Sequence, residues 1–593
     1  MFAKQNRCVF VVCALVLGAV GVSLSQSNDG VGNGKVRKKA FDIDVRSFAR
    51  QIADGMNALG DGIASVGPFR PALSAHLKIL FRLGNVQVND PNLDHIQIFP
   101  NTRPYLLVTQ SETSIASHGR FVVAVYNTSA GIEFIQGPGG IPVLVRRFFS
   151  GYSVSTDRGR TWNSGFMPPL PGSINTLGDP VVDVDRQGNF YFSGLGTDSQ
   201  GRLTIQVNKS TDGGITWSDA ILVAQDSGGD KDWLAIGPDP VRRRQDNIYV
   251  TWTSFTSTGA QLKLARSVDG GVSWDLRTIF APLPNPDPNR PQNALQFSNP
   301  VVDRRNGKLY IPFLQFSNSD QDFIRILVSD DGGENFSFVN FNAPAESDPT
   351  LLPVVQPGEL IDCGSGGLRL TVHAGPDIGG GQLGLRRFVQ ASRLIVQPAF
   401  GVYDDHLFLA WSNSNSMFFG DPNSGSNILF IKSEDGGNSW SEPIQVNPSI
   451  ETNVHHVLPS LNVEGASGIY IAYYVQHDNE KIDVRLAASL DGGSTFGARR
   501  ISSDSSDIAP TNIPLTGIAT TNFDRVVAPC YFLGEYLNIK VAAVNAFQED
   551  VYALWGDGRN LITEPENPDD PISGETHPQA DVFFQHLRIP RQR

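Results

Sequence analysis

Residues 267–274 read Ser-Val-Asp-Gly-Gly-Val-Ser-Trp, and this pattern occurs six times along the chain. It has the form Ser-x-Asp-x-Gly-x-(Ser/Thr/Asn)-(Trp/Phe), and the copies begin at Ser155, Ser210, Ser267, Ser329, Ser433 and Ser489. Successive aspartates are separated by 55, 57, 62, 104 and 56 residues. A period of this length accommodates one four-stranded unit, and such repetition is typical of repeat architectures. The sequence therefore predicts an array of similar sheets.

Each octapeptide has the chemistry of a tight hairpin turn. Its aspartate accepts hydrogen bonds from backbone amides, and its glycine supplies a positive φ. The closing aromatic is expected to pack on the strand that it has just left. A predicted third strand precedes five copies, at Leu203–Val207, Leu262–Ala265, Ile324–Val328, Ile428–Ile431 and Val484–Ala487. Two more strands lie upstream, and this order of strands and turns is that of a propeller blade.

The strand pattern predicts an all-β propeller of seven blades, with six or eight left open. The last unit, from Leu537 to Ile589, has three strands and no octapeptide. Because an open sheet edge invites aggregation, we expect a segment before the first unit to supply the missing strand. Either 95–99 or 105–109 would then pair with Asp581–Ile589 and close the ring.

The first 25 residues have the pattern of a secretory signal peptide. Lys4 and Arg7 precede an apolar run from Val9 to Val22, and small residues stand before a cleavage at Gln26. An uncleaved signal anchor is the alternative, but no run of about 18 apolar residues occurs. We expect a secreted protein with no membrane span, divided into a signal peptide (1–25), an N-terminal extension (26–90) and a propeller (91–593). An insertion at about 337–390 accounts for the doubled spacing.

Secretion determines how the cysteines and sequons are interpreted. Cys363 and Cys530 remain after signal removal as the only possible disulfide pair, and their proximity is left open. Sequons at Asn127, Asn208 and Asn335 fit a glycoprotein surface.

The composition excludes several classes of protein. Of 593 residues, 40% are hydrophobic and 18% charged, and 59 Gly with 38 Pro supply many turns. Coiled coils and extensive disorder are excluded. The net charge of -13 leaves no basic surplus for phosphates, so nucleic acid is not an expected partner.

The octapeptides resemble the Asp-box, or BNR, repeat of the sialidase superfamily of β-propellers. The resemblance covers roughly residues 105–590. It implies the fold far more specifically than the reaction, because sialidases, other glycosidases, glycan lyases and non-catalytic receptors share such propellers. It also implies that the octapeptide aspartates are structural and lie away from the site.

In a propeller, residues before each innermost strand surround one mouth of the central channel. Polar groups recur at these positions, and they are the predicted ligand-binding residues: Glu112, Asp179, Asp230, Lys231, Trp233, Asn299 and His456, with Asp557 and Arg559 from the last unit. Convergent carboxylates in a cleft shift one another's pKa and support acid and base roles. Turn capping is the alternative role for each of them.

The resemblance implies a catalytic set of three arginines, a tyrosine nucleophile assisted by glutamate, and an aspartate acid/base. Tyr536 beside Glu535 is the candidate pair, and Asp232 the candidate aspartate, although adjacent residues of a regular strand point to opposite faces. The family's Arg-Ile-Pro signature is not matched by 69–71 or 102–104. Sialic acid specificity is therefore not implied.

Two functions are carried forward. The first is a secreted sialidase-like glycoside hydrolase acting on a terminal or acidic sugar at the channel mouth. The second is a non-catalytic propeller that binds glycan or protein there. No metal motif occurs, and the match of 379–384 to the dinucleotide pattern GxGxxG lacks the strand and helix of a βαβ unit. The adjacent His455 and His456 do not favour a metal site. Calcium is left open because oxygen ligands gather in 226–232. The oligomeric state is also left open.

Overall fold

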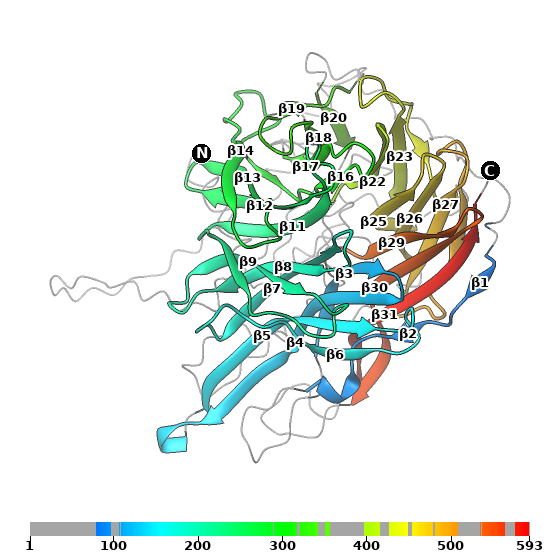
Figure 1. Cartoon of the computed structure of the whole chain (residues 1–593). Helices are drawn as coiled ribbons and strands as arrows, with labels where there is room; N and C mark the ends of the chain where they lie inside the picture. Colours follow the sequence, from blue (N-terminus) through cyan, green and yellow to red (C-terminus); the bar gives the residue numbers. More distant parts are fainter. Residues whose placement is uncertain are drawn as a thin grey trace, which may run out of the picture. The chain divides into compact units, whose positions relative to one another are not determined.

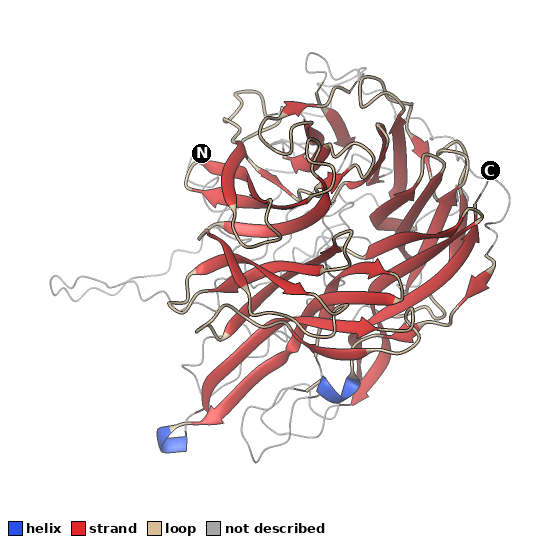
Figure 2. Ribbon diagram, viewed as in Figure 1, coloured by secondary structure: helices blue, strands red, loops and turns tan. Residues whose placement is uncertain are grey.

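The computed structural model describes residues 77–591 apart from these gaps: 78, 96–105, 107, 141, 289, 317–320, 342–349, 356–396, 415–425, 449–453, 478–480, 508–533, 535 and 564–575. The predicted signal peptide, Cys363, Cys530 and Glu535 lie outside the described residues. All described residues belong to one compact unit. Figure 2 shows that strands and loops make up almost all of it, with two short 3-10 helices, η1 (Pro91–Leu93) and η2 (Pro138–Gly140).

Most described strands pair antiparallel with a neighbour in the same unit. Two short parallel pairings, Arg147–Phe148 with Asn175–Thr176 and Ser426 with His455, join neighbouring units into larger sheets. The first three units are β3 (Gln110–His118), β4 (Phe121–Gln136), β5 (Pro142–Ser155) and β6 (Asn163–Phe166); β7 (Asn175–Val184), β8 (Phe190–Thr197), β9 (Leu203–Ser210) and β10 (Ile221–Gln225); and β11 (Gly229–Pro238), β12 (Asp246–Thr256), β13 (Gly259–Ser267) and β14 (Asp275–Phe280).

The fourth unit has short pieces at both edges. It contains β15 (Leu295–Gln296), β16 (Val301–Val302), β17 (Leu309–Gln315), β18 (Gln321–Ser329), β19 (Ser337–Phe338) and β20 (Leu352–Val355). Units five and six are β21 (Ala399–Tyr403), β22 (His406–Ser414), β23 (Ser426–Ser433) and β24 (Ile444–Gln445), then β25 (His455–Glu464), β26 (Gly468–Gln476), β27 (Ile482–Ser489) and β28 (Gly497–Arg500). The predicted third strands are thereby confirmed within β9, β13, β18, β23 and β27.

The seventh unit combines both ends of the described chain. It contains β29 (Asn538–Asn545), β30 (Gln548–Thr563) and β31 (Thr576–Pro590), and β1 (Phe81–Arg82) and β2 (Val86–Gln87) pair with β31. Figure 1 shows β1 beside β31.

The segment that pairs with β31 differs from the predicted one. Phe81 is opposite Arg588 and Val86 opposite Phe584, so the edge strand comes from 81–87. Of the two predicted segments, residues 96–99, 105 and 107 lie outside the described residues. The described edge strand lies before the expected boundary at residue 91. Thr109 forms only an isolated bridge with Ala580.

The first strands of the units contact one another in chain order. β3 contacts β7, β7 contacts β11, and the series continues through β16, β21, β25 and β29. β29 also contacts β3, so the series returns to its start. The Thr113 hydroxyl donates to the Leu554 carbonyl at 3.0 Å across this last junction.

The six octapeptide turns share one hydrogen-bond pattern. In each turn the serine Oγ donates to the aspartate Oδ1 at 2.7–2.8 Å. The same Oγ accepts from the fifth-position glycine at 2.7–2.8 Å. Hydrogen bonds from Ser273 contribute most to holding the pKa of Asp269 at about 2. The aspartates are therefore engaged in their own turns.

The closing aromatics pack across to the preceding unit, which corrects the expectation that they pack on the strand they have just left. Trp217 lies edge-on to Tyr152 at 6.0 Å between ring centroids, and Phe496 lies edge-on to Phe430 at 5.1 Å. Trp162 of the first unit lies 5.1 Å from Phe584 of the seventh. The turn reaches the neighbouring sheet because its glycines leave no Cβ in the way; a Cβ on Gly214 would lie 2.3 Å from Val123.

The largest fully buried side chains are aromatic and lie on the central strands of the units. They include Trp252, Tyr470 and Trp555. Within the described ranges, no helix has the length and apolar character needed to span a bilayer.

Candidate functional site

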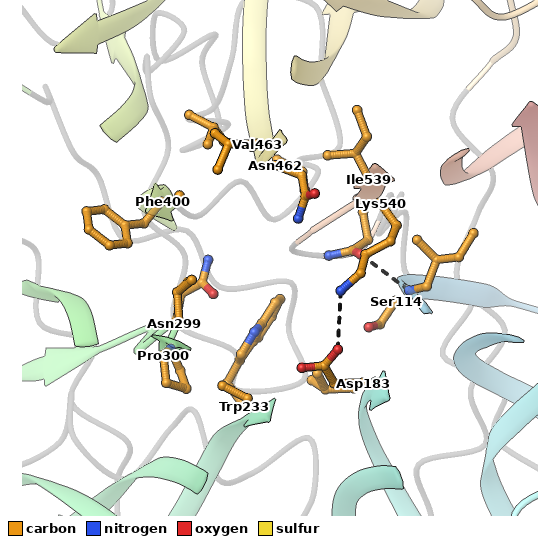
Figure 3. A pocket seen from close by; sticks show the side chains of 18 of the residues that line it. Ser114, Asp183, Trp233, Asn299, Pro300, Phe400, Asn462, Val463, Ile539 and Lys540 are labelled. Atoms are coloured by element: carbon orange, nitrogen blue, oxygen red, sulfur yellow. Dashed lines mark hydrogen bonds and ion pairs between the residues drawn. The ribbon is translucent and has the colours of Figure 1, made fainter. Parts of the chain in front are cut away.

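A cavity of about 340 Å³ lies where the first strands of the seven units meet. Every unit contributes lining residues, for example Ser114, Val181, Trp233, Asn299, Phe400, Asn462 and Lys540. Figure 3 shows side chains from these separate strands pointing toward a common space. No single stretch of sequence contains the site, because it is made by the arrangement of the units.

A recurring bulge shapes the entry of the first strands into this cavity. Glu112, Asp179, Lys231, Phe297 and Leu458 have φ values between 51° and 62°, and all are non-glycine residues in a left-handed conformation. The pairing register shifts at this point in β3, β7, β11 and β25. A bulge redirects the strand, and such strained residues cluster at functional sites.

One ion pair crosses the cavity. The Lys540 Nζ lies 3.2 Å from Asp183 Oδ1, and Figure 3 shows the two side chains pointing toward each other. The backbone N–H of Ile236 donates to the other Asp183 oxygen at 3.0 Å. Burial lowers the pKa of Lys540, and the charge of Asp183 opposes that shift. Asp183 is thus held in a fixed position by two donors.

An aromatic wall lies beside this ion pair. The rings of Trp233 and Tyr536 meet edge to face, with centroids 5.0 Å apart. The amide groups of Asn299 and Asn462 point into the same space (Figure 3). The lining therefore combines an aromatic surface with amide and charged groups, a composition common in small-molecule sites.

Three predicted residues form a buried ionic cluster next to the cavity. Lys231 Nζ lies 3.1 Å from both Glu112 Oε1 and Asp179 Oδ1. Asn127 donates to Glu112 at 2.8 Å. Burial alone would raise the pKa of Asp179, but the charge and hydrogen bonds of Lys231 hold it below its ordinary range. The cluster joins the first strands of three units.

The candidate catalytic residues have different surroundings. Asp232 is 1% exposed and accepts a hydrogen bond from Ser193 at 2.5 Å. Burial raises its pKa well above the usual value, the Ser193 hydrogen bond opposes this, and the charge of Asp179 adds to it. Tyr536 lines the cavity, and its hydroxyl donates to the Pro180 carbonyl at 3.4 Å. Their catalytic roles stay predictions.

The other predicted site residues divide into two groups. Trp233 and Asn299 line the cavity, whereas Asp230 accepts from Gln296 at 2.5 Å within the buried bulge region. His456 is buried and bonded to Ser426, and Asp557 pairs with Arg559 and accepts from the Trp555 indole N–H at 2.8 Å. Asp230, His456, Asp557 and Arg559 are not among the residues that line the cavity.

Sequence reasoning missed Asp183, Lys540 and Asn462. Asp183 and Lys540 alternate with apolar residues in β7 and β29. This alternation predicts that each polar side chain lies on the opposite face of its strand from its apolar neighbours, but it does not predict that the two side chains share a cavity. Arg304 is the arginine among the described lining residues, so this part of the chain brings no set of three arginines to the cavity. In the described ranges, no group of three or more His, Cys, Asp or Glu residues is arranged to hold a metal ion.

No protein-family model matches the chain, and no curated protein matches it significantly. Among solved structures, it is similar to a protein of unknown function from Dyadobacter fermentans, at 10% identity, with a TM-score of 0.36, over 86% of this chain and 100% of that one. An ulvan lyase from a polysaccharide lyase family is similar at 10% identity, with a TM-score of 0.40, over 80% and 93%. A Hadza microbial sialidase is similar at 14% identity, with a TM-score of 0.34, over 86% and 98%.

Proposed function

We propose that the seven units are the blades of a β-propeller and that the secreted chain binds a carbohydrate in its central cavity. The first strand of each unit contacts the first strand of the next, and the seventh contacts the first, which supports a closed ring of blades. The pairing of β1 and β2 with β31 supports its closure, since it covers the edge of the last sheet.

The observation that carries the binding function is the composition of the cavity. Trp233 and Tyr536 offer apolar ring surface, while Asn299, Asn462 and the Asp183–Lys540 pair offer donors and acceptors. A sugar has apolar C–H faces and a rim of hydroxyl groups, so it is complementary to such a lining. A volume of about 340 Å³ suits a ligand the size of one or two sugar rings.

A glycan array followed by calorimetric titration tests this proposal. We expect the wild-type chain to bind a restricted set of glycans, and Asn299→Ala and Arg304→Ala to weaken that binding at least tenfold. Arg305→Ala is the matched control, because Arg305 is adjacent and exposed but does not line the cavity. Equal binding by Arg304→Ala, Asn299→Ala and the wild type would place the ligand elsewhere.

A sialidase-like glycoside hydrolase is the second candidate, favoured by a tyrosine, Tyr536, and two carboxylates from different units in one cavity. Asp183 lies on β7 and Glu464 on β25, and a carboxyl group beside a tyrosine nucleophile can serve as general acid or base. Turnover of sialosides or aryl glycosides that Asp183→Asn abolishes would establish this reading. The predicted roles of Glu535, Tyr536 and Asp232 would be tested by the same assay. Binding without turnover on the whole panel leaves the non-catalytic function.

A further inference from the structure

Two buried carboxylates meet outside the central cavity. Asp94 follows η1 and is 8% exposed, and Asp581 lies on β31 and is 1% exposed. The Asn89 side-chain amide nitrogen lies 2.7 Å from an oxygen of each carboxylate. The two acids are thus neighbours, although nearly the whole described chain separates them in sequence.

Amide groups surround this pair. The Gln110 Nε2 donates to Asp94 Oδ1 at 2.8 Å, and the Gln579 Nε2 lies 3.3 Å from Asp94 and 3.2 Å from Asp581. Within the described ranges, neither carboxylate forms a salt bridge with a lysine, arginine or histidine side chain. Among the described residues these two buried carboxyl groups have amide partners alone, and two negative charges at this position would be costly without a positive charge.

The amide oxygens of this cluster provide an independent indication of a ligand. Gln110 and Gln579 are 1% and 2% exposed, and the Oε1 atom of each is buried without a hydrogen-bond partner. Buried polar atoms in folded proteins nearly always have partners. In both glutamines the Nε2 atom of the same amide group lies within hydrogen-bonding distance of a carboxylate of the pair. Both terminal amide groups therefore lie beside the two carboxylates.

The donor set matches one class of ligand. Rotating a terminal amide exchanges its oxygen and nitrogen, so the glutamines present oxygens to a cation as readily as they present N–H groups to the bare carboxylates. Two carboxylates and two amide oxygens are hard ligands with a combined charge of -2.

We propose that Asp94, Asp581, Gln110 and Gln579 form a calcium site. Calcium accepts six to eight oxygen ligands, including carboxylates and side-chain carbonyls, in flexible geometry. Magnesium retains most of its water and demands octahedral geometry, which a buried cluster of protein oxygens does not favour. This site is separate from residues 226–232, where the sequence left calcium open.

The position of the site gives it a structural role. Asp94 belongs to the segment that follows β1 and β2, while Gln579 and Asp581 belong to β31, and Gln110 begins β3. A cation bound by all four would fasten the N-terminal segment to the last strand and to the first unit. It would stabilise the same junction that β1 and β2 cover, independently of any carbohydrate bound in the central cavity.

Calorimetric titration of the EDTA-treated full chain with CaCl₂ tests the site, together with melting curves in CaCl₂, MgCl₂ and EDTA. We expect binding of calcium, a Tm that rises with calcium concentration, and a clearly smaller effect of magnesium. Asp581→Asn, which keeps the side-chain shape, should abolish both the heat of binding and the Tm shift.

Asp90→Asn is the matched control, because it removes a nearby acid that is bonded to Asn92 within η1 and not to the cluster. It should retain calcium binding. If Asp581→Asn does not fold, Gln579→Met provides the second variant and should weaken calcium binding at least tenfold. No calcium binding by the wild type, an equal response to magnesium, or unchanged binding by a folded cluster variant would overturn the proposal.

Discussion

At the residue scale, the strained bulge positions carry charged groups where most proteins would place glycine. Glu112, Asp179 and Lys231 adopt φ values of 51–53°, and their side chains join in one buried cluster. Left-handed non-glycine residues cost on the order of 1–3 kcal/mol each. The ionic cluster offsets this cost by linking three first strands, so the strain and the charges depend on each other.

Lys231→Met should destabilise the protein strongly. It removes the cation that neutralises two buried carboxylates, and breaking a buried pair in this way typically costs about 3–5 kcal/mol. Denaturant unfolding measures the change. Lys263→Met, at a more exposed lysine bonded to Thr278, serves as control and should change stability by less than about 0.5 kcal/mol. Equal effects of the two substitutions would show that the cluster contributes little.

Asp232→Asn should alter the pH dependence of stability. Because burial raises the folded-state pKa of Asp232 above 3.8, its stabilising contribution is complete below that value and is lost as the pH rises through the folded pKa. The neutral asparagine escapes this loss, so the variant should gain stability relative to the wild type as the pH rises. Unfolding curves at pH 4 to 8 measure the difference, and a difference that stays constant would contradict the expected ionisation.

At the element scale, the octapeptide turn is a contact between sheets as well as a hairpin. Its hydrogen bonds could be predicted from the sequence, because aspartate, serine and glycine at fixed offsets have local partners. The partner of its aromatic could not, since the ring packs on a strand roughly one repeat earlier. The contact between Trp162 and Phe584 is the clearest example, because these two residues lie near opposite ends of the described part of the chain.

Trp162→Ala should weaken the junction between the first and seventh units. Trp162 is half-buried, and loss of its ring contact should cost about 2 kcal/mol and make the N-terminal segment more accessible to protease. Thermal melting and limited proteolysis measure the two effects. Ile215→Ala, at an exposed position of another octapeptide, should leave both unchanged. A protease pattern identical to the wild type would argue against Trp162 closing that junction.

At the scale of the whole molecule, the first and last strands of the described residues lie in one sheet. The need for an extra edge strand could be predicted because the last unit shows only three strands. Its identity could not, since residues 81–87 form two short pieces with no clear alternation. The same limit applies to the cavity: Trp233 and Asn299 were predicted from their place before a strand, whereas Asp183 and Lys540 meet only in three dimensions.

Truncation should reveal the importance of that edge strand. A chain that begins at residue 77 retains β1 and β2 and should remain monodisperse. A chain that begins at residue 89 lacks both strands, exposes one edge of β31 and should aggregate. Size-exclusion chromatography with light scattering compares the two. A monodisperse shorter chain would mean that another segment covers the edge.

A crystal structure of the full chain with a glycan selected from the array tests the proposed architecture and the proposed binding site most directly. We predict seven four-stranded blades in a closed ring, with the sugar between the Trp233 ring, Asn462 and the Asp183–Lys540 pair. A glycan bound at the outer turns, with only solvent in the central cavity, would contradict the proposed function. A ring with a different number of blades would contradict the proposed architecture.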